Sequence, residues 1–310
     1  MVRPWSESVA EQVCDEFVAR FGISEAHPKL ISFRQNAIFY FTKNGISLRI
    51  YGPGEDPGRA ALMVNCARWL ESHDFPAVRP SPILAEQPFD LLGYQISVWR
   101  WVSQDDLRPN SAFLYGRLLR SFHALPGNNE LPALAFDPVG KIRHRLDRLK
   151  VGEIISTEAQ ALLEHVFDRV YGRQADLRNS KLGQGIIHGD AMLGNAIQRD
   201  GQMVMIDLDS VTLGPREWDL APMAVGSKRF GQRGQVRWRE FLEGYGVDER
   251  DLAELDAAAI IKQLSMTVYL CLSAGQSAEI DEEITRRLRM WSDWDLDDHW
   301  STGFTVAPDH

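Results

Sequence analysis

The chain has 310 residues, of which 44% are hydrophobic and 25% charged, and its formal net charge is -9 at pH 7. This length exceeds one typical domain and suits two lobes, and the composition is that of an ordinary globular protein. The acidic balance argues against nucleic acid as a partner and permits cationic ligands. No apolar run approaches the ~18 residues that a membrane-spanning helix needs, so no membrane association is expected.

Cysteine usage and the amino terminus both favour the cytoplasm. The three cysteines are odd in number and widely spaced, and each lies in an apolar helical pattern, so we expect buried, reduced thiols at Cys14, Cys66 and Cys271. The opening residues show no apolar segment followed by a small-residue cleavage site, so no signal peptide is expected. A cytoplasmic protein is therefore predicted.

The first predicted elements are a helix and a group of strands. Ser6 can cap a helix that continues to about Phe21 and stops at Gly22. Strands are then predicted over 29–34, 37–43 and 46–51.

The last two of these strands are joined by Asn44-Gly45, which is a strong hairpin signal. In the return strand, Arg49 alternates with aliphatic residues and so points to the opposite face.

The next segment changes from strand to helix signals. A helix is predicted over 59–72, a short strand over 83–85, and a longer strand-like run over 94–102. From residue 111 the pattern becomes helical, which places the lobe boundary near 104–110. Helices are predicted over 111–125, 138–149, 157–177, 217–225, 235–245, 249–273 and 279–290.

The stretch 185–222 carries the strongest pattern in the sequence. A short apolar run reads as a buried strand that ends at His188-Gly189-Asp190, and Asn195 follows five residues after Asp190. Asp200-Gly201 then predicts a hairpin whose return strand, 203–206, leads to Asp207. In the usual register residue 199 faces 202 and residue 195 faces 206. Asn195 and Asp207 then come to one end of the ribbon, beside Asp190.

These side chains suit phosphoryl transfer. Carboxylates and a carboxamide at strand ends are ligands that Mg²⁺ prefers, and a carboxylate turned away from the metal can accept a proton from a hydroxyl. The spacing from Asp190 to Asn195 matches the Asp and Asn of the protein-kinase catalytic loop, with Asp207 in the place of its metal-binding Asp. Here, however, Gly189 replaces the kinase Arg, and Ile-Asp-Leu-Asp replaces Asp-Phe-Gly.

With these residues the stretch resembles the aminoglycoside phosphotransferase and choline kinase-like family of small-molecule kinases. The family pattern is HGDxxxxN, then a hydrophobic residue with Asp-x-Asp, then a Gly and Trp/Asp-Leu-Ala. Its tail is supplied here by Gly214, Trp218, Asp219, Leu220 and Ala221. The resemblance implies an α+β, protein-kinase-like fold of two lobes. A small antiparallel-sheet lobe at 1–104 would bind the nucleotide, and a larger, mostly helical lobe at 105–310 would carry catalysis and the acceptor.

The resemblance also implies roles for the central residues. Asp190 is the expected catalytic base, and Asn195 and Asp207 are expected to hold Mg²⁺. Asp209 is a further candidate, either for a second metal or as a support of the loop. ATP or GTP would be the co-substrate, and Arg49 would grip its α- and β-phosphates.

Supporting roles follow from the same resemblance. His188 is expected to be a structural hydrogen-bonding residue, and Trp218 and Asp219 are expected to brace the catalytic loop. The family usually places a Glu on the helix 59–72 to hold the strand cation, but Met63 and Asn65 stand there in this sequence. The ion-pair partner of Arg49 is therefore left open.

The remaining nucleotide contacts are implied in the first lobe. Backbone amides around Gln35 and Asn36, in a loop without glycine, would cover the phosphates. The run that ends at 99–102 would be the hinge that pairs with the adenine edge. Its Trp99 and Trp101 either stack on the base or pack in the core.

The acceptor is expected to be cationic. Acidic and tryptophan residues alternate in the carboxyl-terminal part, which suits charge pairing and cation–π contact with an aminosugar or basic peptide, although a solvated acidic helix and tail is the alternative. These residues are Glu279, Asp281, Glu282, Glu283, Trp291, Asp293, Trp294, Asp295, Asp297, Asp298 and Trp300. The prediction is O-phosphorylation of an aminoglycoside-like or other cationic antibiotic, which would give resistance, by a monomer or homodimer.

Three other functions are compatible with the sequence. A metabolic kinase for choline, homoserine or a sugar is the nearest alternative. The missing helix Glu is compatible with a nucleotide-binding module without catalysis. A metal-dependent hydrolase would leave the kinase-like first lobe unexplained.

Overall fold

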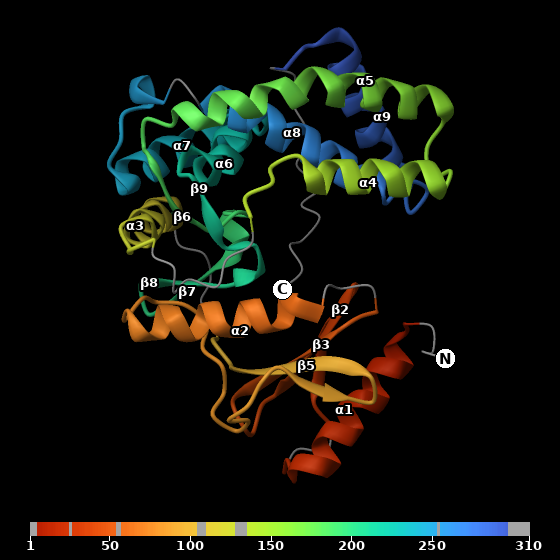
Figure 1. Ribbon diagram of the computed structural model, residues 1–310, viewed down its shortest axis with the longest axis vertical. Helices are drawn as coiled ribbons and strands as arrows, with labels where there is room; N and C mark the ends of the chain where they lie inside the picture. The colour runs from red at the N-terminus through yellow and green to blue at the C-terminus, as the bar shows by residue number, and fades with distance from the viewer. Residues whose placement is uncertain are drawn as a thin grey trace.

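The computed structural model describes residues 5–24, 27–53, 57–103, 110–127, 135–252 and 255–296 and arranges them in two lobes (Figure 1). The first lobe contains an antiparallel sheet of five strands in the order β1-β2-β3-β5-β4. Its elements are α1 (Glu7–Phe21), β1 (Lys29–Phe33), β2 (Asn36–Phe41), β3 (Ile46–Tyr51), α2 (Pro57–Ser72), β4 (Phe89–Leu91) and β5 (Tyr94–Arg100).

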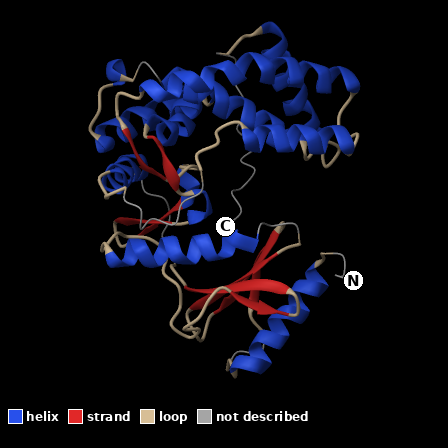
Figure 2. Ribbon diagram, in the orientation of Figure 1, coloured by secondary structure: helices blue, strands red, loops and turns tan. Residues whose placement is uncertain are grey.

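The second lobe is mostly helical, and Figure 2 shows its strands gathered on the side that faces the first lobe. They form two short antiparallel ribbons, β6–β9 and β7–β8. The α-helices and strands are α3 (Ser111–His123), α4 (Gly140–Val151), α5 (Thr157–Tyr171), β6 (Gln184–Ile187), β7 (Ala196–Arg199), β8 (Gln202–Met205), β9 (Thr212–Pro215), α6 (Glu217–Arg229), α7 (Gly231–Tyr245), α8 (Leu255–Cys271) and α9 (Ala278–Asp293). Short 3₁₀ turns lie at Gly172–Asn179, Leu193–Asn195, Leu208–Ser210 and Glu249–Asp251. The predicted two-lobe α+β organisation is confirmed.

The sheet of the first lobe has one apolar and one polar face. Phe17 of α1 packs in a buried cluster with Leu48 and Ile50 of β3, because alternate strand residues point to the same side. Arg49, between them, points to the other side, as its place in the alternation predicts. The apolar face anchors the sheet and leaves the polar face available for chemistry.

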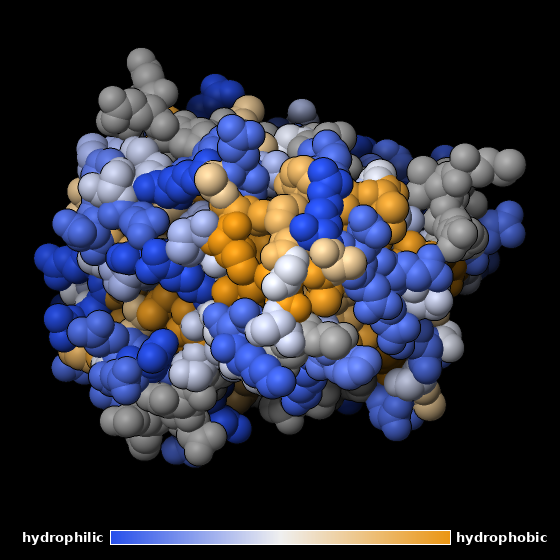
Figure 3. Space-filling view, turned by 90° about the horizontal axis from the view of Figure 1, so that it is seen from below, coloured by the Kyte–Doolittle hydropathy of each residue, from blue (hydrophilic) through white to orange (hydrophobic). Residues whose placement is uncertain are grey.

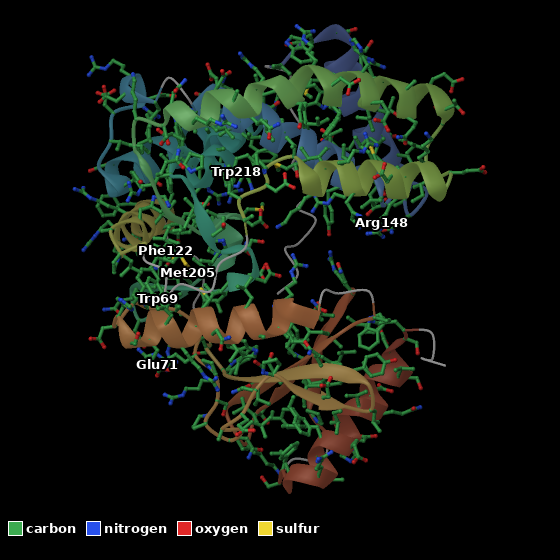
Figure 4. The ribbon with its side chains drawn as sticks, in the orientation of Figure 1. Trp69, Glu71, Phe122, Arg148, Met205 and Trp218 are labelled. Atoms are coloured by element: carbon green, nitrogen blue, oxygen red, sulfur yellow. The ribbon has the colours of Figure 1, made fainter. Side chains whose placement is uncertain are left out.

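Helix α2 ties the first lobe to the second. Trp69 of α2, Phe122 of α3 and Met205 of β8 belong to one buried cluster (Figure 4). Met205 also pairs with the chain after α2, since its N–H donates to the Pro76 carbonyl (2.9 Å) and its own carbonyl accepts from the Val78 N–H (2.9 Å). The hairpin β7–β8 is therefore fixed to both lobes.

Several boundaries differ from the predictions. The turn between β2 and β3 spans residues 42–45 rather than Asn44-Gly45 alone, since Phe41 pairs with Ile46. Residues 83–85 form no strand; β4 lies at 89–91 instead. Strand β9 was not predicted, and the helix expected from residue 249 begins at 255. A lobe boundary at 104–105 lies outside the described residues and stays a prediction.

The three cysteines are buried and unbridged, as expected. No helix among the described residues is long and apolar enough to cross a membrane. Seen from below, an apolar area occupies the middle of a largely hydrophilic face (Figure 3).

Phe17 is expected to be a main stabilising residue of the first lobe, because its side chain is fully buried against the sheet. Replacing it with Ala should cost about 3–5 kcal/mol of folding free energy, from lost burial and the cavity left behind. Urea denaturation would measure this, with the exposed neighbour Glu16→Ala as the control. A loss below about 1 kcal/mol would show that α1 contributes little to the lobe.

Candidate active site

One buried carboxylate fixes the backbone of the catalytic-loop segment at His188 and Gly189. Asp219, at the start of α6, accepts hydrogen bonds from the backbone N–H groups of His188 (2.6 Å) and Gly189 (2.9 Å). It also contacts His123 Nε2 (3.0 Å), and the Trp218 indole N–H donates to the Gly189 carbonyl (2.8 Å). Trp218 and Asp219 therefore brace the loop, as predicted.

Gly189 is required by its conformation and its surroundings. Its φ is +81°, and a Cβ at this position would lie 2.2 Å from the Ser210 carbonyl oxygen. Any other residue would clash with the loop that follows Asp207. The close approach explains why glycine stands between His188 and Asp190 here.

His188 has a structural role, as predicted. Its ring is buried, and Nε2 lies 2.9 Å from the Ile206 carbonyl while Nδ1 accepts from the Asp190 N–H (3.3 Å). The imidazole thus links the catalytic loop to the strand that leads to Asp207.

The hairpin β7–β8 forms in the predicted register. Arg199 pairs with Gln202 across the Asp200-Gly201 turn, and the Ile206 N–H donates to the Asn195 carbonyl (3.0 Å). Asn195 and Asp207 therefore reach the same end of the ribbon.

The donor set at this end suits a divalent cation. The Asn195 amide donates to the Asp190 carbonyl (2.8 Å), but its Oδ1 is buried and has no hydrogen-bond partner. A buried acceptor of this kind is costly unless something binds it. No group of three or more His, Cys, Asp or Glu side chains suited to a metal occurs among the described residues. Protein oxygens here would thus share an ion with phosphate and water, as Mg²⁺ prefers.

The two aspartates after β8 repel each other. Asp207 has a φ of +57°, an uncommon conformation for a residue other than glycine. Burial and the charge of Asp209 raise the pKa of Asp207 to about 6, and the cation Arg49 only partly offsets them. Asp209 itself is held by Arg59 Nε (3.2 Å) and by the Ser210 hydroxyl (3.0 Å). Added positive charge would relieve this repulsion.

Arg49 pairs across the lobes rather than with α2. Its Nη1 lies 3.4 Å from Asp207 Oδ1, and its Nη2 lies 4.0 Å from Asp209 Oδ2. Among the described side chains of α2, its hydrogen-bond partner is the Met63 thioether, whose Sδ lies 3.4 Å from Nη1. Asn65 is exposed. Met63 therefore occupies the place where the resemblance expects a Glu, and the carboxylates of the second lobe supply the ion pair.

Asp190 has a cationic neighbour that the sequence analysis missed. Lys262 of α8 is buried and places Nζ 3.3 Å from Asp190 Oδ1 and 3.0 Å from the Gly189 carbonyl. Burial disfavours ionisation of the Asp190 carboxyl, but the charges of Lys262 and Lys141 outweigh it and lower its pKa. A lysine within an otherwise apolar helix was the signal, because such a residue needs a buried partner.

The residues predicted to contact the nucleotide in the first lobe differ in burial and in hydrogen bonding. The Asn36 side chain accepts from the Gly52 N–H (3.2 Å) and so shapes its loop, while Gln35 is exposed. Trp99 is buried, and its indole donates to Ser97 (2.7 Å). Its ring is thus part of the core.

Trp101 packs differently from Trp99. Its ring stacks on Tyr40, with centroids 4.0 Å apart, and it stays partly exposed. Of the two tryptophans, Trp101 has the more accessible ring.

The acidic tail does not form the expected cationic-ligand site. Glu283 is buried against Arg287 (2.8 Å), and Trp291 is buried and donates to Thr267 (3.1 Å). Arg169 covers the ring of Trp294 at 3.4 Å. Asp297, Asp298 and Trp300 lie outside the described residues. Glu283, Trp291 and Trp294 therefore hold α9 in place, whereas Glu282 and Asp293 are exposed.

Comparison with known proteins identifies the family. The model of the phosphotransferase enzyme family, which includes the aminoglycoside phosphotransferases, matches residues 32–257. The chain belongs to this phosphotransferase family. A search of curated protein sequences gave no significant match.

Solved structures share the fold of this phosphotransferase at low sequence identity. An amicoumacin kinase bound to AMP-PNP, Ca²⁺ and its antibiotic is 13% identical, with a TM-score of 0.72 over 94% of this chain and 96% of that one. A choline/ethanolamine kinase family protein from Mesorhizobium loti is 16% identical (TM-score 0.64; 91% and 94% covered). A spectinomycin phosphotransferase bound to ADP and spectinomycin is 15% identical (TM-score 0.62; 91% and 93%). The protein-kinase-like fold is thus confirmed, and the phosphotransferase is a small-molecule kinase by family.

The repulsion at Asp207 predicts a stability effect. Because the folded-state pKa of about 6 exceeds the ordinary value of 3.8, stability of the metal-free protein should fall as pH rises from about 4 to 6, and the penalty is fully present above pH 6. The Asp207→Asn variant should therefore melt at the same or a higher temperature at pH 7.5. Its free energy of unfolding should rise by on the order of 1–2 kcal/mol.

Thermal melting without metal would check this, with the exposed Asp168→Asn on α5 as the control. A strongly destabilised Asp207→Asn would mean that its pairing with Arg49 outweighs the repulsion.

Proposed function

We propose that this protein transfers the γ-phosphate of ATP or GTP to a hydroxyl of a small molecule, with Mg²⁺ as cofactor. The observation that carries the proposal is the convergence of Asp190, Asn195 and Asp207 at one end of the β7–β8 hairpin, with the buried Asn195 Oδ1 left without a partner. Phosphoryl transfer needs positioning and charge neutralisation more than covalent chemistry, and this arrangement supplies both.

Asn195 and Asp207 would hold the metal, whose chemistry is to neutralise the charge on the phosphates. Asp209, already engaged by Arg59, would support them or hold a second ion. Arg49 would grip the phosphates from the first lobe, which requires it to exchange part of its contact with Asp207 for the nucleotide. The relatives bound to AMP-PNP and ADP support a nucleotide in this place.

Asp190 would orient the acceptor hydroxyl and receive its proton. A carboxylate with a lowered pKa is a weak base, which suits a transition state in which the proton leaves late. Lys262 would keep this carboxylate ionised and in position, since it contacts both the Asp190 side chain and the Gly189 carbonyl.

The hinge and the glycine-free loop would complete the nucleotide site. Backbone groups of residues 99–102 would meet the adenine edge, and Trp101 rather than Trp99 would offer a ring to the base. Amides near Gln35 and Asn36 would lie over the phosphates. We further propose a cytoplasmic location.

For the acceptor, antibiotics are the first class to test. Structural neighbours act on amicoumacin and spectinomycin, although likeness at this identity supports only the fold. A metabolic role is the second candidate, supported by the choline/ethanolamine kinase neighbour. The tail gives little support for a cationic acceptor, because Glu283 is paired with Arg287, Trp291 is buried, and the ring of Trp294 is covered by Arg169.

Asp190→Ala is expected to lower turnover by ~10²–10⁴-fold, the usual contribution of a positioned base, with nucleotide affinity little changed. Coupled ADP release against a panel of alcohols and antibiotics would measure it, with Asp168→Ala as the matched aspartate control. A fully active Asp190→Ala enzyme would refute the assignment.

The affinity for Mg²⁺-ATP should depend on pH. Metal binding requires ionised Asp207, whose pKa is about 6 in the free protein, so affinity should fall below pH 6 by up to about tenfold per pH unit. Titration calorimetry from pH 5 to 8 would show the midpoint. A flat profile would show that Asp207 does not hold the metal.

A further inference from the structure

Helix α4 carries a row of cations along one face. Lys141, Arg145 and Arg148 are spaced four and three residues apart, so they lie above one another on the helix. Among the described residues, no carboxylate lies within ion-pair distance of any of the three. The row therefore concentrates positive charge without an ion pair among the described residues, although Asp190 and Asp209 act on Lys141 from farther away.

On the other flank of α4, the positive charge of Arg143 is balanced by ion pairs with carboxylates. Arg143 pairs with Asp147 (2.9 Å) and with Glu164 of α5 (2.6 Å). The pKa of Glu164 is lowered chiefly by its hydrogen bonds to Arg143, with a contribution from Lys150, which places Lys150 on this flank. Arg143 thus forms ion pairs, whereas no carboxylate among the described residues lies within ion-pair distance of the three cations in the row.

The row begins at the catalytic centre. Lys141 Nζ donates to the hydroxyl of Ser210 (2.9 Å), the residue that follows Asp209. Lys141 is exposed at its surface. Desolvation by the surrounding protein lowers its pKa, and the negative charges of Asp190 and Asp209 raise it but do not fully offset this effect.

The row then leads away from the metal-binding end. An α-helix rises 1.5 Å per residue, so Arg145 and Arg148 lie about 6 Å and 10 Å along α4 from Lys141. Arg145 donates to the Ser265 hydroxyl (3.0 Å) and covers the Tyr269 ring at 4.9 Å. Both partners follow Lys262 on α8, three and seven residues further along the helix.

The last two arginines of the row differ in how firmly they are held. Arg145 is held by its α8 contacts, which fix the planar guanidinium in advance of binding. Arg148 is exposed and projects from α4 on the side of the first lobe (Figure 4). The charged groups near this region are the carboxylates Asp190, Asp207 and Asp209 and the cations Arg49, Arg59, Lys141, Arg145, Arg148 and Lys262. Mg²⁺ held by Asn195 and Asp207 would offset these carboxylates further, so cations would outnumber carboxylates on the acceptor side.

We propose that Arg145 and Arg148 bind an oxyanion of the acceptor, so that the substrate is a small alcohol carrying a carboxylate or phosphate group. The inference rests on the proposed phosphotransferase function. Guanidinium groups match both oxyanions geometrically, and a polycationic acceptor would meet like charges at this surface. In the transfer, the acceptor oxygen bonds to the γ-phosphorus as the bond to the bridging oxygen breaks. Its proton passes to Asp190, and ADP leaves with the bonding electron pair.

The test is thermal melting of the full chain saturated with Mg²⁺ and AMP-PNP, titrated with matched small molecules. D-glycerate and glucose 6-phosphate are the two oxyanion sources, glycerol and glucose are their neutral counterparts, and choline and kanamycin are the cations. An oxyanion should raise the melting temperature well beyond its neutral counterpart. Arg148→Ala and Arg145→Ala should each raise its half-saturating concentration roughly tenfold or more, as expected for a lost charged hydrogen bond.

Controls separate charge from folding. Lys150→Ala removes the same charge from the other flank and should leave the titration unchanged. Arg145→Lys keeps the charge and should retain part of the affinity. Arg148 is exposed, so its replacement leaves the fold intact.

The outcomes are distinct. The proposal is overturned if neither oxyanion binds, if choline or kanamycin binds better, or if the arginine variants leave oxyanion binding intact. It is also overturned if they weaken AMP-PNP binding instead, since the row would then serve the nucleotide. If Mg²⁺ and AMP-PNP do not raise the melting temperature of the unchanged protein, the proposed function itself fails.

Discussion

The grip of the Asp219 carboxylate on two backbone N–H groups is the constraint on which the active centre depends. It turns the chain at His188 and Gly189 so that Asp190 emerges beside Lys262. A fully buried carboxylate is costly to desolvate, and charge-assisted hydrogen bonds offset that cost. The loop conformation is therefore set by α6, and its tight packing against Ser210 admits only glycine at position 189.

The lobes meet through charge as well as through packing. Arg49 and Arg59 reach from the first lobe to Asp207 and Asp209 of the second. With Met63 on α2, Arg49 has no acidic partner within its own lobe among the described residues. Its position is thus coupled to the same carboxylates that are proposed to hold the metal. Metal and nucleotide binding would redistribute these contacts, because both compete for the same groups.

Acceptor choice in this fold is a question of charge placement. The acids near the carboxyl terminus are numerous in the sequence, but Glu283 is buried against Arg287 and others stabilise α9. The cations Lys141, Arg145 and Arg148 of α4 are fewer, yet among the described residues no carboxylate lies within ion-pair distance of them, and Lys141 contacts Ser210 beside Asp209. Local geometry, not composition, decides what the acceptor side can bind, since screening and internal pairing cancel distant or compensated charge.

Short-range patterns were sufficient for much of this protein. The Asp200-Gly201 turn determined the hairpin register, strand alternation determined the face of Arg49, and the spacing of Asp190, Asn195 and Asp207 indicated the chemistry. Each depends on neighbours in the chain, where residue type dictates backbone geometry. Only the tertiary structure showed that Lys262 contacts Asp190, that Met63 lies beside Arg49 where an acid was expected, and that Lys141 of α4 reaches Ser210 beside Asp209. These contacts join residues far apart in sequence. The energy of a charged side chain depends on its distance to other charges, and only folding sets that distance.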